Sequence, residues 1–137
     1  IIAGLNHINK NIYDEAVAKS GASVKVLYNK TYDLLKNSNA AIVTSGTATL
    51  ETALIGTPQI VCYATNSLNM FLAKLFVKIN FISLVNLILN KEVVKELIQS
   101  DFNKEMIKAE LNLILKGKRN QIQKDYKDLR NLLKYSE

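Results

Sequence analysis

Residues 44–51 read Thr-Ser-Gly-Thr-Ala-Thr-Leu-Glu, and this stretch decides the fold class of the chain. It follows the apolar run Ala40–Val43 and precedes a helical pattern that stops at Gly56-Thr57-Pro58. A strand that ends in small hydroxyl residues and glycine, and then opens a helix, aims backbone N–H groups and the positive end of the helix dipole at one point. Such a point suits a phosphate group.

The helix that follows adds an acidic side chain to this point. Glu51 lies four residues after Thr47, so the two side chains share one side of the helix. A carboxylate beside a phosphate pocket can accept two hydrogen bonds from a ribose diol, and the local residues therefore indicate a nucleotide-diphosphate site. The alternative is that the serine and threonines only cap the helix, as they do in many α/β folds. Gly46 stands alone and no Gly-Lys-Ser/Thr follows, so this is neither a Walker loop nor a dinucleotide fingerprint.

Predicted strands and helices alternate along the rest of the chain. Apolar runs bounded by turn residues predict strands at Ile1–Leu5, Val24–Tyr28, Ala40–Val43, Gln59–Tyr63 and Phe81–Val85. Spaced apolar residues predict helices at Asn9–Lys19 with Gly21 as its cap, Thr31–Lys36, Glu92–Gln99, Lys104–Leu115, and after Gly117, where Ile122, Tyr126, Leu129 and Leu133 form a stripe. This order predicts an α/β fold: a Rossmann-like parallel sheet flanked by helices, with C-terminal helices, in a single domain of residues 1–137.

Two polar interruptions of the apolar sequence are expected at one rim of this sheet. In open parallel sheets, ligands bind outside the carboxyl ends of the strands. Ser45–Thr47 follows one predicted strand, and Ser83 and Asn86 lie at the end of another. Their convergence favours a ligand site over a simple helix cap.

Composition restricts the partners and the compartment. The chain carries 18 Lys+Arg against 12 Asp+Glu, a net charge of +6, which favours anionic partners. Nucleic acid is not expected, because Asp125 and Asp128 interrupt the basic terminal helices and aromatic residues do not interleave with the charges. Cys62 is the only cysteine and His7 the only histidine, so we expect a reduced, cytoplasmic protein without a disulfide, a metal or a cofactor.

The apolar region from Leu68 to Leu89 is not a transmembrane segment, because polar and charged residues such as Lys74 and Lys78 interrupt it. Its first part, Leu68–Ile79, has two interpretations. It is either a basic apolar helix in peripheral contact with the inner face of an anionic membrane, or a helix that packs on the sheet with its lysines in water. General burial preferences favour packing.

Residues 45–58 resemble the nucleotide-sugar half of GT-B-type glycosyltransferases, which have two facing Rossmann-like domains. Three further segments, 71–78, 82–88 and 91–99, look like the C-terminal half of the lipid-A-disaccharide synthase family. The resemblance is specific from about Ala40 to Gln99 and weaker elsewhere. It implies a truncated C-terminal domain that binds the nucleotide of a UDP-sugar.

The activity that the resemblance implies is an inverting sugar transfer in lipid A biosynthesis. The family moves 2,3-diacylglucosamine from its UDP donor to 2,3-diacylglucosamine 1-phosphate and forms the β-1,6 lipid A disaccharide. By motif matching, the implied UDP-binding residues are Ser45, Gly46 and Thr47 at the diphosphate, Glu51 at the uridine ribose, Asn86 in the same pocket, and Ser83, Glu96 and Gln99 near it. We expect no metal ion at this site.

The chain departs from the family pattern at Val85, where the family commonly has proline, and at Leu89-Asn90, where it has Ala-Gly. The apolar start Ile1–Leu5 looks like a strand cut from a longer protein and not like a signal peptide. The acceptor domain, with its acidic base candidates, is then expected before Ile1 as the partner of this half. We therefore expect no catalytic residue here and no activity of this chain alone.

Two other hypotheses stay open. One is another UDP-sugar protein of the same architecture, such as the peptidoglycan N-acetylglucosaminyltransferase or UDP-N-acetylglucosamine 2-epimerase. Residues 82–88 followed by 91–99 argue against both of these enzymes. The other is a free-standing module that binds a nucleotide or a partner without chemistry.

Overall fold

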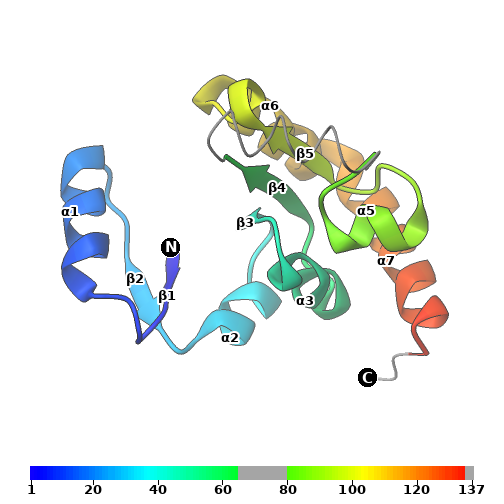
Figure 1. Ribbon diagram of the computed structural model, residues 1–137, viewed down its shortest axis with the longest axis horizontal. Coiled ribbons are helices and arrows are strands. Elements are labelled where there is room, and N and C mark those ends of the chain that lie inside the picture. Colours follow the sequence, from blue (N-terminus) through cyan, green and yellow to red (C-terminus); the bar gives the residue numbers. More distant parts are fainter. Residues whose placement is uncertain (65–79, 135–137) are drawn as a thin grey trace, which may run out of the picture. The chain divides into compact units, whose positions relative to one another are not determined.

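The computed structural model describes residues 1–64 and 80–134 (Figure 1). The chain divides into two compact units, Ile1–Asn37 and Ser38–Glu137. The helix expected at Leu68–Ile79 lies outside the described residues. Each unit contains its own parallel strands.

The first unit has the element order that the sequence predicts. It comprises β1 (Ile2–Gly4), α1 (Lys10–Ser20), β2 (Val26–Tyr28) and α2 (Thr31–Lys36). The strands β1 and β2 pair in parallel, with Ala3 opposite Leu27. As predicted, Gly21 ends α1 in the left-handed conformation, with φ of 62°.

Tyr28 fixes how α1 and the strands of this unit pack. A Cβ atom on Gly4 would lie 2.6 Å from the Tyr28 ring, so only glycine fits there. The rings of Tyr13 and Tyr28 meet edge to face at 5.7 Å between centroids. The Tyr13 hydroxyl also accepts the Leu5 N–H at 3.0 Å, which ties α1 to the end of β1.

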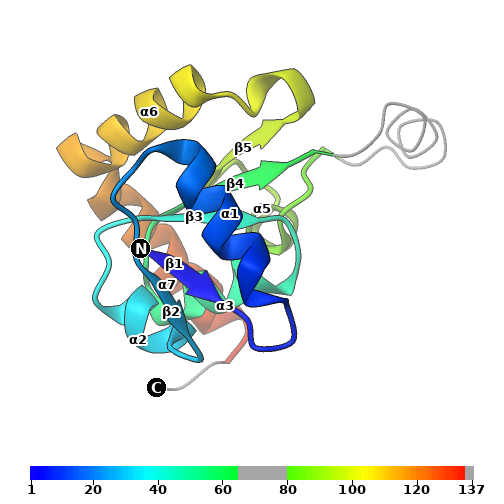
Figure 2. The ribbon, with the colours of Figure 1, turned by 90° about the vertical axis from the view of Figure 1, so that its left-hand side faces the viewer.

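The second unit contains a three-stranded parallel sheet of order β3-β4-β5 (Figure 2). Its elements are β3 (Ala41–Thr44), α3 (Thr47–Ile55), β4 (Gln59–Tyr63), α5 (Leu84–Leu89), β5 (Lys95–Ile98), η1 (Gln99–Asp101), α6 (Lys104–Leu113), η2 (Ile114–Lys118) and α7 (Arg119–Leu132). The helix α6 contacts β4 and β5, whereas α3 contacts β3, β4, α5 and α7. Residues 59–62 of the central strand β4 are buried, which explains its continuous apolar sequence. The predicted Rossmann-like α/β fold with flanking helices is confirmed.

Two predicted elements are wrong. Phe81–Val85 is not a strand: it forms a bend that leads into α5, and the Ser83 hydroxyl caps that helix by accepting the Asn86 N–H at 3.3 Å. Glu92–Gln99 is not a helix: it forms a loop, then β5. The same contact accounts for both differences. The N–H groups of Ile82 and Ser83 donate to the side-chain carboxylate of Glu96 on β5 and not to the backbone of a neighbouring strand.

The apolar stripe predicted on the last helix packs into the core. Ile122, Tyr126 and Leu129 are buried on α7, whereas Leu133 lies beyond the end of α7 and is exposed. The core of this unit consists of Ala53, Ile60, Val61, Cys62, Val85, Val93, Val94, Leu97, Ile114, Ile122, Tyr126 and Leu129. The break predicted at Gly117 is confirmed, since the helical path kinks there between α6 and α7.

Replacing Leu129 should reveal how much α7 stabilises the second unit. Leu129 is 0% exposed, so Leu129→Ala leaves a cavity and should lower the free energy of unfolding by about 2–5 kcal/mol. Leu132, on the same helix, is 59% exposed, and Leu132→Ala should change the free energy of unfolding by less than about 0.5 kcal/mol. Urea unfolding of both variants measures the difference. Equal effects would show that α7 does not dock through this stripe.

Candidate functional site

The turn between β3 and α3 lies at the carboxyl end of the sheet. Ser45 N–H donates to the Cys62 carbonyl at 3.0 Å, which holds the turn beside the end of β4. Gly46 follows with φ of 149° and ψ of −165°, a region that other residues rarely adopt. A Cβ atom on Gly46 would meet nothing within 4 Å among the described residues, so the space beside this backbone is open. A ligand can approach the backbone closely there.

The hydroxyl groups near this turn do not cap α3. Gly46 is the N-cap residue, and no side chain of the described residues forms the cap hydrogen bond. Ser45 Oγ donates to the Ile82 carbonyl at 3.0 Å, and Thr49 Oγ1 donates to the Gly46 carbonyl at 2.8 Å. The simple capping alternative is therefore wrong. The Thr49 N–H donates to the Gly46 carbonyl at 3.1 Å. The two amides before it, of Thr47 and Ala48, have no intrahelical acceptor, so they can donate to solvent or an anion.

Thr47 and Glu51 occupy the exposed side of α3 next to this turn. Thr47 is the first residue of the helix, and Glu51 follows one turn later, as the sequence predicts. Buried Thr49 and Thr52 face the core instead. The arrangement places a carboxylate one helical turn from the amides that open α3.

Asn86 lies in a different environment from the one expected of a ligand-binding side chain. It is 0% exposed, and its amide makes four hydrogen bonds. Nδ2 donates to the Val94 carbonyl and to Glu96 Oε1, both at 2.8 Å. Oδ1 accepts the N–H groups of Val93 and Val94 at 2.8 and 3.0 Å. These four bonds use the full capacity of the amide, so a direct ligand contact would require one of them to break.

Glu96 and Ser83 also point to neighbouring protein groups. The two carboxylate oxygens of Glu96 accept the N–H groups of Ile82 and Ser83 at 2.8 and 2.9 Å. Ser83 is buried at the start of α5. Gln99 follows β5 directly, is half-buried, and has a left-handed backbone with φ of 54°. The structure thus brings Ser45 and the 80–83 bend together, while direct nucleotide contacts by Ser83, Asn86, Glu96 and Gln99 stay predictions.

Other chemistry is sparse in the described part of the chain. Residues 1–64 and 80–134 contain no group of three or more His, Cys, Asp or Glu that could hold a metal ion. Burial raises the pKa of the Cys62 thiol, as expected for a packing residue and not a reactive one. Within the same residues no helix is both long and apolar enough to cross a membrane.

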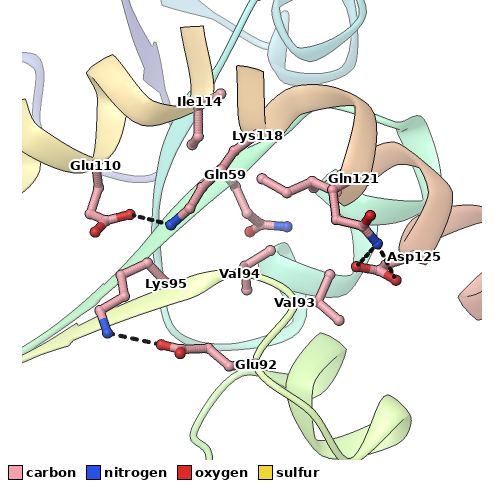
Figure 3. Close-up of a pocket in the computed structure, with 11 residues that line it drawn as sticks. Gln59, Glu92, Val93, Val94, Lys95, Glu110, Ile114, Lys118, Gln121 and Asp125 are labelled. Atoms are coloured by element: carbon pink, nitrogen blue, oxygen red, sulfur yellow. Dashed lines mark hydrogen bonds and ion pairs between the residues drawn. The ribbon is translucent and has the colours of Figure 1, made fainter. Parts of the chain in front are cut away.

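A cavity of about 210 Å³ lies near the amino ends of β4 and β5 (Figure 3). The Gly46 turn follows the opposite, carboxyl end of β3. The buried side chain of Gln59 contributes to its lining, together with Val93 and Val94. Its charged residues pair with lysines: Glu92 with Lys95, Glu110 with Lys118, and Asp125 with Lys91. Each carboxylate of the lining thus has a cationic partner, although Lys91 itself does not line the cavity.

Sequence reasoning missed the backbone part of the site. The carbonyl of Ile82 and the N–H groups of Ile82 and Ser83 link the turn after β3 to Glu96 on β5. A backbone group carries no signature in the sequence. Glu96 was among the residues that the family resemblance implied near the pocket, but its backbone partners were not predicted.

Comparison with known proteins adds the family. The sequence model of the lipid-A-disaccharide synthetase family matches residues 5–136. Lipid-A-disaccharide synthase of Syntrophus aciditrophicus is 38% identical over 131 residues, which is 93% of this chain and 34% of that protein. The enzyme of the same name from Wigglesworthia glossinidia brevipalpis is 42% identical over 96 residues, covering 70% of this chain and 25% of its own length.

A third protein of that name, from a Sulfurihydrogenibium species, is 45% identical over 75 residues, or 55% of this chain and 19% of its own. The chain spans about a third or less of the length of these relatives. The family match covers both structural units, and the alignment with the Syntrophus aciditrophicus enzyme covers 93% of the chain. This chain belongs to the lipid-A-disaccharide synthetase family.

Proposed function

We propose that this chain is the UDP-binding part of an enzyme that transfers 2,3-diacylglucosamine from UDP to 2,3-diacylglucosamine 1-phosphate. The observation that carries the proposal is the uncapped start of α3 at Gly46, which is open on the side where a Cβ would lie. Family membership supplies the substrate class. The acceptor and the general base belong to parts of the enzyme outside this chain.

The proposed role of α3 is to bind the diphosphate. The amides that follow Ser45, together with the positive end of the helix dipole, bind the phosphate oxygens. Glu51 accepts hydrogen bonds from the ribose hydroxyls one helical turn away. Gly46 permits close approach because it has no side chain.

The same amides also favour the chemical step. In an inverting transfer, the acceptor hydroxyl attacks the anomeric carbon from the side opposite UDP, and its proton passes to the general base. As the bond between that carbon and the phosphate oxygen breaks, negative charge develops on the departing UDP. Fixed amides at a helix N-terminus stabilise such charge without reorganising. No residue of this chain touches the acceptor in this scheme.

We also propose a cytoplasmic location with peripheral contact to an anionic membrane surface. The net charge of +6 favours such a surface, since basic residues near anionic lipid are attracted to it. The acylated substrates of the proposed reaction reside in a membrane, which gives this contact a purpose. The segment Leu68–Ile79, one candidate for it, lies outside the described residues.

Nucleotide titration tests the proposal directly. Isothermal calorimetry of the chain should give tighter binding of UDP than of UMP, by roughly tenfold, because the second phosphate adds charge-assisted hydrogen bonds to the amides. ADP should bind more weakly than UDP, since the family uses uridine donors. Equal affinity for UMP and UDP would contradict a diphosphate at the α3 turn. No binding of UDP at all would contradict the proposal for this chain.

Adding one methyl group at Gly46 should weaken UDP binding. Gly46→Ala forces alanine into φ of 149°, at a cost of about 1–3 kcal/mol, or moves the turn and its amides. We expect UDP affinity to fall by roughly tenfold. Gly21→Ala is the matched control, because Gly21 also has positive φ and open space around its missing Cβ. Similar UDP affinities in the two variants would exclude the Gly46 turn as the phosphate site.

Glu51 can be tested with a modified ligand. Glu51→Ala should weaken UDP binding by about 1.5–3 kcal/mol, the value of a hydrogen bond to a charged group. The same substitution should reduce the binding free energy of 2′-deoxy-UDP by less, because this ligand already lacks one of the ribose hydroxyls that Glu51 would bind. Calorimetry with both ligands gives the coupling between Glu51 and the 2′-hydroxyl. Equal losses for both ligands would remove that hydroxyl from the role of Glu51.

A further inference from the structure

One peptide group, between Ile82 and Ser83, is hydrogen-bonded at both of its polar ends. Its N–H, from Ser83, donates to Glu96 Oε1 at 2.9 Å. Its carbonyl, from Ile82, accepts the Ser45 hydroxyl at 3.0 Å. The preceding N–H, of Ile82, donates to the second carboxylate oxygen, Glu96 Oε2, at 2.8 Å. Glu96 on β5 is therefore joined to the turn after β3 through a single peptide group.

The carboxylate of Glu96 is suited to hold this peptide group firmly. It accepts three N–H donors, those of Ile82, Ser83 and Asn86 Nδ2, and no described lysine or arginine forms an ion pair with it. Hydrogen bonds to an ionised acceptor are about twice as strong as neutral ones. An N–H that donates to an anion also makes the carbonyl of the same peptide group a stronger acceptor. The bond from Ser45 benefits from this polarisation.

The hydrogen bonds of Ser45 restrict what that residue can do. A hydroxyl has one donor, and Ser45 uses it on Ile82. The Ser45 N–H is used as well, on the Cys62 carbonyl. Phosphate oxygens need donors, so while these bonds persist the side chain of Ser45 cannot serve a phosphate. What Ser45 does is fix the backbone from which Gly46 and the start of α3 continue.

We infer that Glu96 is a positioning residue for the nucleotide site: it orients the Ile82–Ser83 peptide group, which holds Ser45 and thereby aims the amides that open α3. The inference rests on the proposed function, because the orientation of these amides matters to a ligand only if they bind the UDP diphosphate. It gives Glu96 and Ser45 an indirect role and leaves direct binding to the amides after Ser45.

The test replaces Glu96 with its nearly isosteric amide. In Glu96→Gln, an NH₂ group takes the place of one oxygen and must face at least one N–H donor, so part of the hydrogen bonding is lost. Glu92→Gln is the matched control, since Glu92 is close in sequence, is exposed in the loop before β5, and loses the same charge. Backbone ¹⁵N–¹H spectra, UDP affinity and thermal unfolding are measured for both variants of the chain.

We expect Glu96→Gln to shift the amide signals of Gly46 and Thr47, which Glu96 does not contact, and to weaken UDP binding roughly three- to thirtyfold. Glu92→Gln should leave the signals and the affinity unchanged. Ser45→Ala removes the last link and should reproduce both effects, which keeps the test decisive if Glu96→Gln does not fold. Because the residues act in series, the double variant should bind UDP no more weakly than Ser45→Ala alone.

Different outcomes overturn different claims. If Glu96→Gln shifts the amide signals of Ile82 and Ser83 but not those of Gly46 and Thr47, the proposed link through Ser45 is wrong. This conclusion does not depend on what the chain binds. If it only lowers the unfolding temperature and the folded variant binds UDP normally, Glu96 is structural and not a positioning residue. If the wild-type chain does not bind UDP, the proposed function fails, and the nucleotide role of Glu96 fails with it.

Discussion

The carboxylate of Glu96 provides hydrogen-bond acceptors for a bend that belongs to no strand or helix. Residues 80–83 lie between the end of the undescribed segment and α5, and the N–H groups of Ile82 and Ser83 need partners. A buried N–H without a partner costs about 1–3 kcal/mol, so a single carboxylate that serves both has a large effect on the chain path. Asn86 extends this network, because its amide joins α5 to the backbone of Val93 and Val94 just before β5. The start of α5 and the position of β5 beside β4 are thereby set together.

Local sequence patterns predicted the helices and strands whose ends are set by neighbouring turn residues. The bounds of β4 and α2, Gln59–Tyr63 and Thr31–Lys36, agree with the prediction because turn residues flank both segments. The patterns failed at 81–85, a short apolar run, and at 92–99, where two apolar pairs separated by charged residues fit a strand or a helix equally well. The contacts that decide there join Ile82 and Ser83 to Glu96, 14 and 13 residues away respectively. No window of local sequence contains that information.

The candidate site divides in the same way. The position of the turn at Ser45–Thr47 was predictable, because a strand, a glycine and a helix follow one another in the sequence. The direction of each side chain was not predictable. The Ser45 hydroxyl could have capped α3, bound a ligand or reached another loop, and a contact 37 residues away selects the third. Asn86 looked like a binding residue because it is polar in an apolar stretch, yet burial and four hydrogen bonds account for its polarity.

The two ends of α3 differ in how their backbone groups are satisfied. At the C-terminal end, the N–H of Gly56 donates to the carbonyls of Thr52 and Ala53, and the guanidinium of Arg130 on α7 donates to those of Ala53 and Leu54 at 3.5 and 3.4 Å. A cation there also compensates the negative end of the helix dipole. At the N-terminal end no side chain of the described residues caps the helix.

This asymmetry connects the packing of the core with the chemistry of the rim. Gln59 Nε2 donates to the carbonyl of Thr49 and to the hydroxyl of Tyr126, so β4 holds the first turn of α3 and links it to α7. The helix is thus held both at its C-terminal end by Arg130 and in its first turn by Gln59. Such a helix can meet an anion without paying to reorganise, because its orientation is set before the ligand arrives. The Glu96 network then fixes the backbone path from Ser45 into Gly46, just before the helix begins.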